Sequence, residues 1–114
     1  MIRFTAVDIL LAELPFTTGV SRKIRPVLVM LDTGDEDVTV APVTTSTAAS
    51  LDSVPLQDFR QAGLVKPSAV RLHKVTTIHK QRALTRLGHL SSEDFAQVSR
   101  KWQELFVAWH EREP

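Results

Sequence analysis

Apolar residues in the first half of the chain fall into short runs separated by polar turns. Residues 6–14 and 26–31 are rich in aliphatic side chains and have the length of buried strands, and a basic loop containing a glycine joins them. The acidic sequence at 32–37 indicates a turn, and the run that starts at Val38 predicts a third strand that returns antiparallel. The simplest topology for these three strands is a meander.

The second half of the chain predicts a loop and two further strands. Residues 44–53 are small and rich in hydroxyl groups, which is typical of a loop, and residues 54–56 have the pattern of a brief strand. Along residues 68–78, Val70 and Leu72 alternate with Arg71 and His73. This alternation predicts a half-buried strand with a basic outer side.

The C-terminal segment has helical periodicity. Ser91 is a good N-cap with Asp94 three residues later. The apolar residues that follow recur at helical spacing, namely Phe95, Val98, Trp102, Leu105, Phe106 and Trp109. We expect this stripe to cover the sheet, and ordinary core packing is strongly preferred to a ligand-binding role for its aromatic rings. The predicted fold class is therefore α+β and mainly β, with a terminal helix packed on the sheet.

Composition favours one globular domain over residues 1–114. The chain is 43% hydrophobic and 24% charged, so it is neither disordered nor fibrous. The absence of cysteine excludes disulfides and thiolate chemistry and is compatible with a reducing compartment, so we expect a cytoplasmic protein. The longest apolar run near the start, 9–12, is too short to span a membrane, and Asp8 precedes it where a signal peptide would carry positive charge.

Charge is unevenly distributed, although the net charge is only +1. No acidic residue stands between Asp58 and Glu93, whereas this segment contains seven cations: Arg60, Lys66, Arg71, Lys74, Lys80, Arg82 and Arg86. If the segment folds onto one face, it creates a positive field suited to phosphates. The same charges could equally be solvent-facing residues of strands, and charge alone does not separate the two interpretations.

Signatures of metal and nucleotide sites are absent from the sequence. The histidines, His73, His79, His89 and His110, do not form HExxH or another recognised ligand spacing. The GxSxG, GxxxxGK[ST] and GxGxxG patterns are missing as well. We therefore expect neither a metal nor a cofactor.

Arg25 and Thr44 are the residues whose predicted positions suggest chemistry. Arg25 stands before Pro26 at the expected start of the second strand, and Thr44 ends the third, so the antiparallel turn between them brings the two ends together. A guanidinium beside a hydroxyl can bind a phosphate whose charge grows in a transition state. Taken alone this signal is weak, because Arg and Thr are common cross-strand neighbours and a proline-opened strand with an arginine in water would look the same.

Five pieces, taken in order, resemble the MazF/PemK-like toxins of type II toxin–antitoxin systems over nearly the whole chain. They are VDILLAELPFTTG from Val7, RPVLVM from Arg25, APVTTS with Pro42, Thr44 and Thr45, AGLVKPSAVRLHKVTTI, and RLGHLSSEDF. The chain departs from the family pattern at Val7, where a glycine is usual, and it lacks an acidic residue that some members carry before their Arg-Pro.

The resemblance implies a compact antiparallel barrel related to SH3 folds and to the CcdB-like gyrase poisons. It also implies a homodimer, a cognate antitoxin, and metal-independent endoribonuclease activity on single-stranded RNA such as mRNA. The family's catalytic arginine corresponds to Arg25 and its catalytic threonine or serine to Thr44. The expected RNA-binding residues are Thr17, Arg22, Lys23, Thr45, Ser46, Arg71 and Lys74.

Two alternatives of other classes stay open. One is a non-catalytic inhibitor like the gyrase-poisoning toxins, in which the C-terminal end contacts the target and Trp109 would be exposed. The other is an inactive member that persists as a binding module.

Overall fold

The structure, a computed structural model, describes residues 2–15, 22–45 and 52–112. Thr17 and Ser46, which were expected to bind RNA, lie outside these residues. In chain order the elements are β1 (Asp8–Pro15), β2 (Arg22–Leu31), β3 (Asp37–Thr44), β4 (Ser53–Pro55), β5 (Ala69–Arg71), the 3-10 turn η1 (Leu72–Lys74), β6 (Thr76–His79), the 3-10 turn η2 (Lys80–Arg82), β7 (Ala83–His89) and the helix α1 (Ser92–His110).

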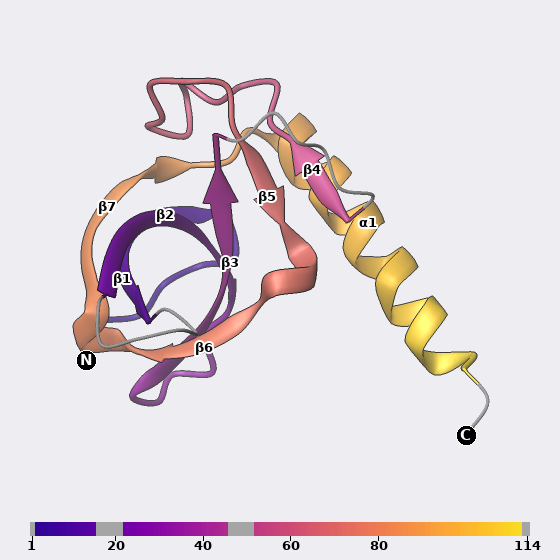
Figure 1. The fold of residues 1–114 in the computed structure, drawn as a ribbon, viewed down its shortest axis with the longest axis horizontal. Coiled ribbons are helices and arrows are strands. Elements are labelled where there is room, and N and C mark those ends of the chain that lie inside the picture. Colours follow the sequence, from indigo (N-terminus) through magenta and orange to yellow (C-terminus); the bar gives the residue numbers. More distant parts are fainter. Residues whose placement is uncertain (1, 16–21, 46–51, 113–114) are drawn as a thin grey trace.

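The strands form one antiparallel sheet in the order β4-β5-β3-β2-β1-β7, and β6 also pairs with β3. The predicted β1-β2-β3 meander and the mainly-β α+β class are confirmed. The sheet curves strongly (Figure 1), but the described strands do not close into the expected barrel. The reason is local: the chain crosses from β6 on one side to β7 on the other through η2, a three-residue turn that adds no strand pairing.

Strands β1 to β3 are covered on both faces, which explains their nearly continuous apolar sequences. Alternate residues enter different clusters, since side chains along a strand point to opposite faces. One cluster, called the inner core here, lies on the concave side and consists of Leu10, Ala12, Val27, Val29, Val38, Val40 and Ile78. The other, the outer core, lies against α1 and includes Ile9, Leu28, Val43, Val70, Leu72 and Val98.

The start of α1 is anchored by one buried carboxylate. Ser91 caps the helix as predicted, because its Oγ accepts a hydrogen bond from the Asp94 N–H at 3.1 Å. The Asp94 side chain does not return to the cap. It accepts one hydrogen bond from the N–H of Gln57 and one from that of Asp58, each at 2.9 Å. The carboxylate therefore ties the first turn of α1 to the segment that follows β4.

The prediction that the whole apolar stripe of α1 covers the sheet is wrong for its C-terminal half. Val98 is buried in the outer core, whereas Trp102, Phe106 and Trp109 are 40%, 56% and 69% exposed. With 19 residues the helix is about 28 Å long. It lies along the three-residue strand β4 and extends well beyond it (Figure 1), so its distal aromatics have no sheet beneath them.

Two glycines allow a close backbone contact between the 58–64 segment and β7. Gly63 has a φ of +84°, and a Cβ there would lie 2.2 Å from the carbonyl oxygen of Leu87. A Cβ on Gly88 would lie 2.7 Å from the backbone of Ala62. The AGL and LGH sequences thus mark the place where two main chains pack directly against each other.

A buried ion pair joins the N-terminal segment, the β2–β3 turn and η2. Lys80 Nζ lies 2.9 Å from Asp32 Oδ1 and also donates to the carbonyl oxygen of Ile2. The Asp32 carboxylate accepts hydrogen bonds from the N–H groups of Phe4 and Gly34, both at 2.8 Å. One of the seven cations of the acid-free segment is thus part of the fold.

Candidate functional site

Arg25 lies inside β2 and not at its start, because β2 begins at Arg22 and not at the expected residue 26. The additional residues pair with β1, which places Arg25 opposite Ala12 and Lys23 opposite Leu14. Pro26 lies just before the first β2–β3 pair, Val27 with Pro42. Its missing N–H therefore falls where the ladder to β3 has not yet begun.

The orientation of Arg25 follows from the alternation of β2. Lys23 and Arg25 share a face with Val27 and Val29, which belong to the inner core. Their cross-strand partners lie on the same face, so Leu14 and Pro42 also face this side. The concave face therefore carries an apolar core in its middle and cations where β2 runs past that core.

At this open end of the inner core lies a cleft of about 580 Å³. Its lining residues are Leu14, Pro15, Lys23, Arg25, Pro42, Val43, Thr44, Arg71, Lys74 and Thr76. Four are cationic, two carry hydroxyl groups and, in the described part of the chain, none is acidic. A cleft with this lining attracts anions.

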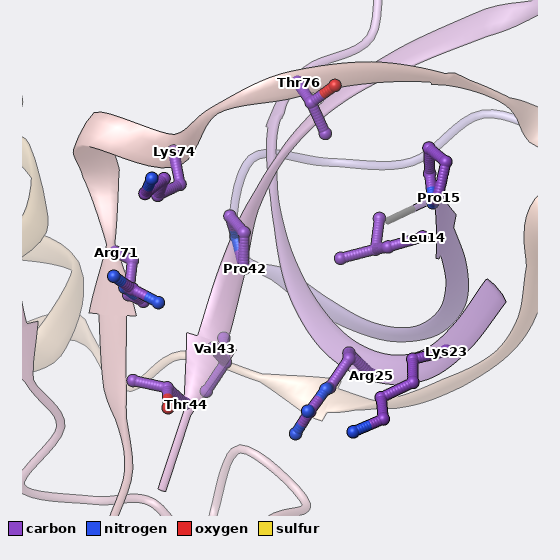
Figure 2. Close-up of a pocket in the computed structure, with 10 residues that line it drawn as sticks. All are labelled: Leu14, Pro15, Lys23, Arg25, Pro42, Val43, Thr44, Arg71, Lys74 and Thr76. Atoms are coloured by element: carbon purple, nitrogen blue, oxygen red, sulfur yellow. The ribbon is translucent and has the colours of Figure 1, made fainter. Parts of the chain in front are cut away.

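Arg25 and Thr44 both line this cleft, so the two residues that the sequence placed near each other share one surface. Each stands two residues beyond Val27–Pro42, the last pair of the β2–β3 ladder, and on the same side of that pair. Figure 2 shows their side chains at one end of the cleft, on either side of Val43. Arg25 is exposed and Thr44 half-buried, so both are within reach of a ligand.

Some of the expected RNA-binding residues line the cleft, and others lie outside it. Lys23, Arg71 and Lys74 line the cleft, with Arg71 on β5 and Lys74 in η1. Arg22, at the start of β2, and Thr45, directly after β3, are exposed but do not line it.

The acid-free segment is only partly directed to the cleft. Arg71 and Lys74 line it, whereas Lys80 pairs with Asp32, and Arg86 Nη2 lies 2.9 Å from Asp8 Oδ1. The segment therefore has more than one role in the fold. It supplies two cations to one concave surface, and other cations in it form ion pairs within the fold.

Thr76 and the apolar lining residues Leu14 and Pro15 were not identified from the sequence. Only the pairing of the strands, and not the type of these residues, could have identified them. Thr76 pairs with Val40 of the inner core, and Leu14 pairs with Lys23, so both share the face of Arg25. Residues 68–78, expected as one strand, are instead divided by η1, and this break brings Lys74 and Thr76 to the cleft.

The arrangement suits charge stabilisation better than metal chemistry. Within the described residues, no group of three or more His, Asp or Glu side chains could hold a metal ion. The cleft offers guanidinium, ammonium and hydroxyl donors, which bind phosphate oxygens.

None of the helices among the described residues is long and apolar enough to cross a membrane.

Fold and cleft together define a small, mainly-β protein with a cationic cleft on its concave face. Comparison with known families makes the assignment specific: the description "PemK-like, MazF-like toxin of type II toxin-antitoxin system" matches residues 5–106. The chain therefore belongs to this toxin family, and the resemblance seen in the sequence is confirmed.

Solved structures agree with the family assignment. The Mycobacterium tuberculosis toxin MazF-mt6 is 26% identical, with a TM-score of 0.72 over 88% of this chain and 96% of that one. An endoribonuclease from Mycobacterial species is 14% identical, with a TM-score of 0.72 over 100% and 98% of the two chains. A Mycobacterial endoribonuclease in complex with its cognate antitoxin is also 14% identical, with a TM-score of 0.67 over 100% of both chains. At 14% identity these two endoribonucleases show the fold. No curated protein matches the chain by sequence.

Proposed function

We propose that this toxin is a metal-independent endoribonuclease that cleaves single-stranded RNA. The observation that carries the proposal is the position of Arg25 and Thr44 in one cleft that is cationic and has no acidic lining residue among those described. Two proteins of similar structure, both endoribonucleases, are consistent with it. We further propose that residues 1–114 act as a single domain.

The reaction is an internal transesterification. The ribose 2′-OH attacks the adjacent phosphorus, the bond from phosphorus to O5′ breaks, and the products end in a 2′,3′-cyclic phosphate and a 5′-OH. The 2′-OH loses its proton to solvent, and the leaving O5′ takes one from solvent, so the proton count balances. A guanidinium stays charged and has no acceptor, so Arg25 is not a base. It donates hydrogen bonds to the phosphorane and the leaving oxygen, while Thr44 holds a non-bridging oxygen.

The remaining cations bind the RNA backbone. Lys23, Arg71 and Lys74 line the cleft and would contact flanking phosphates, with Arg22 and Thr45 at its margins. Contacts of this kind supply affinity that does not depend on sequence and that decreases with salt.

The proposal includes a homodimer, a cognate antitoxin and a cytoplasmic location. The uncovered aromatic stripe of α1 supports association, since exposed apolar surface of this kind commonly marks a protein interface. The antitoxin is supported by the family and by the neighbour solved with its own antitoxin.

The test is cleavage of a mixed RNA in EDTA, with analysis of the product ends. Arg25→Ala should slow cleavage by at least about a hundredfold, because it removes the main donor to the developing charge. Thr44→Ala should slow it by about tenfold or more. The matched controls are Arg100→Ala on the exposed surface of α1 and Thr85→Ala on β7, and both should cleave as the wild type does. Full activity in the Arg25 and Thr44 variants would refute the site.

One observation favours a second candidate, the gyrase-type inhibitor. That class was expected to expose its C-terminal tryptophan, and Trp109 is 69% exposed. In that case Trp109→Ala would abolish toxicity, and the protein would leave RNA intact in EDTA. The Arg25–Thr44 cleft would then be dispensable, so growth arrest by Arg25→Ala would favour this candidate over the ribonuclease.

A further inference from the structure

We propose that Leu14, Pro15, Pro42 and the methyl group of Thr76 form a subsite for one unstacked nucleobase beside the scissile phosphate. This inference rests on the proposed function, since it assumes that the ligand of the cleft is a single-stranded nucleic acid.

The lining of the cleft is divided between charge and apolar surface. Its cations come from β2, β5 and η1, whereas the apolar side chains come from β1 and β3. A free phosphate would use only the cationic part. A nucleotide carries a charged backbone and a largely apolar, planar base, so it can fill both parts at once.

The apolar part continues the inner core. Leu14 packs against that cluster from outside while remaining partly exposed in the cleft. Thr76 pairs with Val40, and Pro42 pairs with Val27, so both stand directly beside buried core residues. A base lying here would cover the last exposed layer of an already packed apolar surface.

Phosphate and base sites adjoin each other through strand pairing. Leu14 is directly opposite Lys23, and Arg25 follows Lys23 by two residues on the same face. In Figure 2 the Leu14 side chain projects into the space between Thr76 and Arg25. Neighbouring side chains on one face of an antiparallel pair lie within about 5–8 Å, which is the reach from a phosphate to its own base.

The chemistry of the subsite decides how it acts. The side chains of Leu14, Pro15 and Pro42 offer no hydrogen-bonding group. The subsite therefore holds the base by contact with its face, and Leu14 acts as an affinity determinant, separate from the catalytic pair.

The test measures binding to RNA that cannot be cleaved. The probes are 2′-O-methyl heptanucleotides carrying each of the four bases, or an abasic residue, at the central position. Wild-type protein should bind the best base about tenfold more tightly than the abasic probe, the amount expected for one well-packed base. Leu14→Asn, which keeps the number and branching of the side-chain heavy atoms but is polar, should lose most of this ratio. Leu14→Met, which keeps both volume and apolarity, should retain it.

Because Leu14 is partly buried, each variant is first compared with the wild type by thermal unfolding. If Leu14→Asn does not fold, Thr76→Ser serves instead, since it removes only the methyl group and should reduce the ratio several-fold. Equal affinity of wild type for base and abasic probes, an unchanged ratio in the polar variant, or no measurable RNA binding would each overturn the subsite. Cleavage is measured separately, so a base-dependent protein that cuts no RNA would refute the proposed function and leave the subsite standing.

Discussion

Asp94 holds α1 to the rest of the protein, and its replacement by alanine should be among the most destabilising single changes. Its side chain is fully buried and accepts two main-chain hydrogen bonds of 2.9 Å, from Gln57 and Asp58. Alanine leaves both N–H groups without their acceptor.

The magnitude follows from the two contacts. A hydrogen bond to a charged group contributes about 1.5–3 kcal/mol, so Asp94→Ala should lower the free energy of unfolding by about 3–6 kcal/mol. This is a large part of the roughly 5–15 kcal/mol that a domain has in total. Asp94→Asn keeps one acceptor oxygen and should lose about half as much.

Urea unfolding followed by circular dichroism measures both variants. The matched control is Glu93→Ala, the exposed neighbour in the same turn, which should change the free energy of unfolding by less than about 1 kcal/mol. A loss below 1 kcal/mol in Asp94→Ala would refute the argument that these two bonds hold the helix. Folded Asp94→Asn should cleave RNA normally, because none of the cleft residues belongs to α1.

Three further predictions follow from contacts outside the helix. The hydrogen bond from the Phe4 N–H, helped by Lys80 and Gly34 and opposed by burial, lowers the pKa of Asp32 from its ordinary value near 3.8 to about 2. Its contribution to stability is therefore complete above about pH 4 and lost as the pH falls toward 2, which urea midpoints across that range will show. Gly88→Ala should cost about 1–3 kcal/mol, because the new Cβ meets backbone and not a flexible side chain. Arg71→Ala should raise KM and lower the salt slope of RNA binding by about 0.7, with kcat nearly unchanged.

Each of these predictions has its own control. Asp32→Asn should be less stable at pH 7, and its urea midpoint should no longer follow the Asp32 titration. A stability equal to wild type in Gly88→Ala would mean that the two backbones can separate without cost. Lys66→Ala removes an exposed cation that does not line the cleft, so a change in salt slope as large as that of Arg71→Ala would show that the cleft is not the RNA site.

The strands were predictable where burial on both faces leaves a continuous apolar run. Val27 to Val29 and Val40 to Val43 are such runs, and β2 and β3 contain them. The start of β2 was missed because Arg22 to Arg25 are exposed and carry three cations, which resembles a loop. β7 was not identified as a strand because it lies at the edge of the sheet, where Leu84 is 47% exposed and no alternation of burial is imposed.

The positions of Arg25 and Thr44 were predictable for a different reason from the rest of the cleft. Arg25 and Thr44 lie on two adjacent strands joined by one turn, on the side remote from that turn, so a local argument was sufficient. Leu14 and Thr76 reach the same cleft through the β1–β2 and β3–β6 pairings, and such long-range pairings are not visible in residue spacing. The helical stripe was predicted correctly as a pattern, but the pattern could not say that β4 has only three residues.

Because side chains alternate along β2, the face on which Arg25 lies depends on its spacing from the apolar residues of the same strand. Arg25 faces the cleft because it stands two residues before Val27 and four before Val29, while Ile24, 55% exposed, faces the other way. Inserting one residue between Arg25 and Pro26 would leave the apolar segment paired as before but turn the guanidinium to the opposite face. Inserting two would restore its direction but move it about 7 Å along the strand. The two-residue repeat of β2 therefore fixes the position of Arg25. Natural or designed variants of this toxin that change the length of the strand there would lose the arrangement of the cleft.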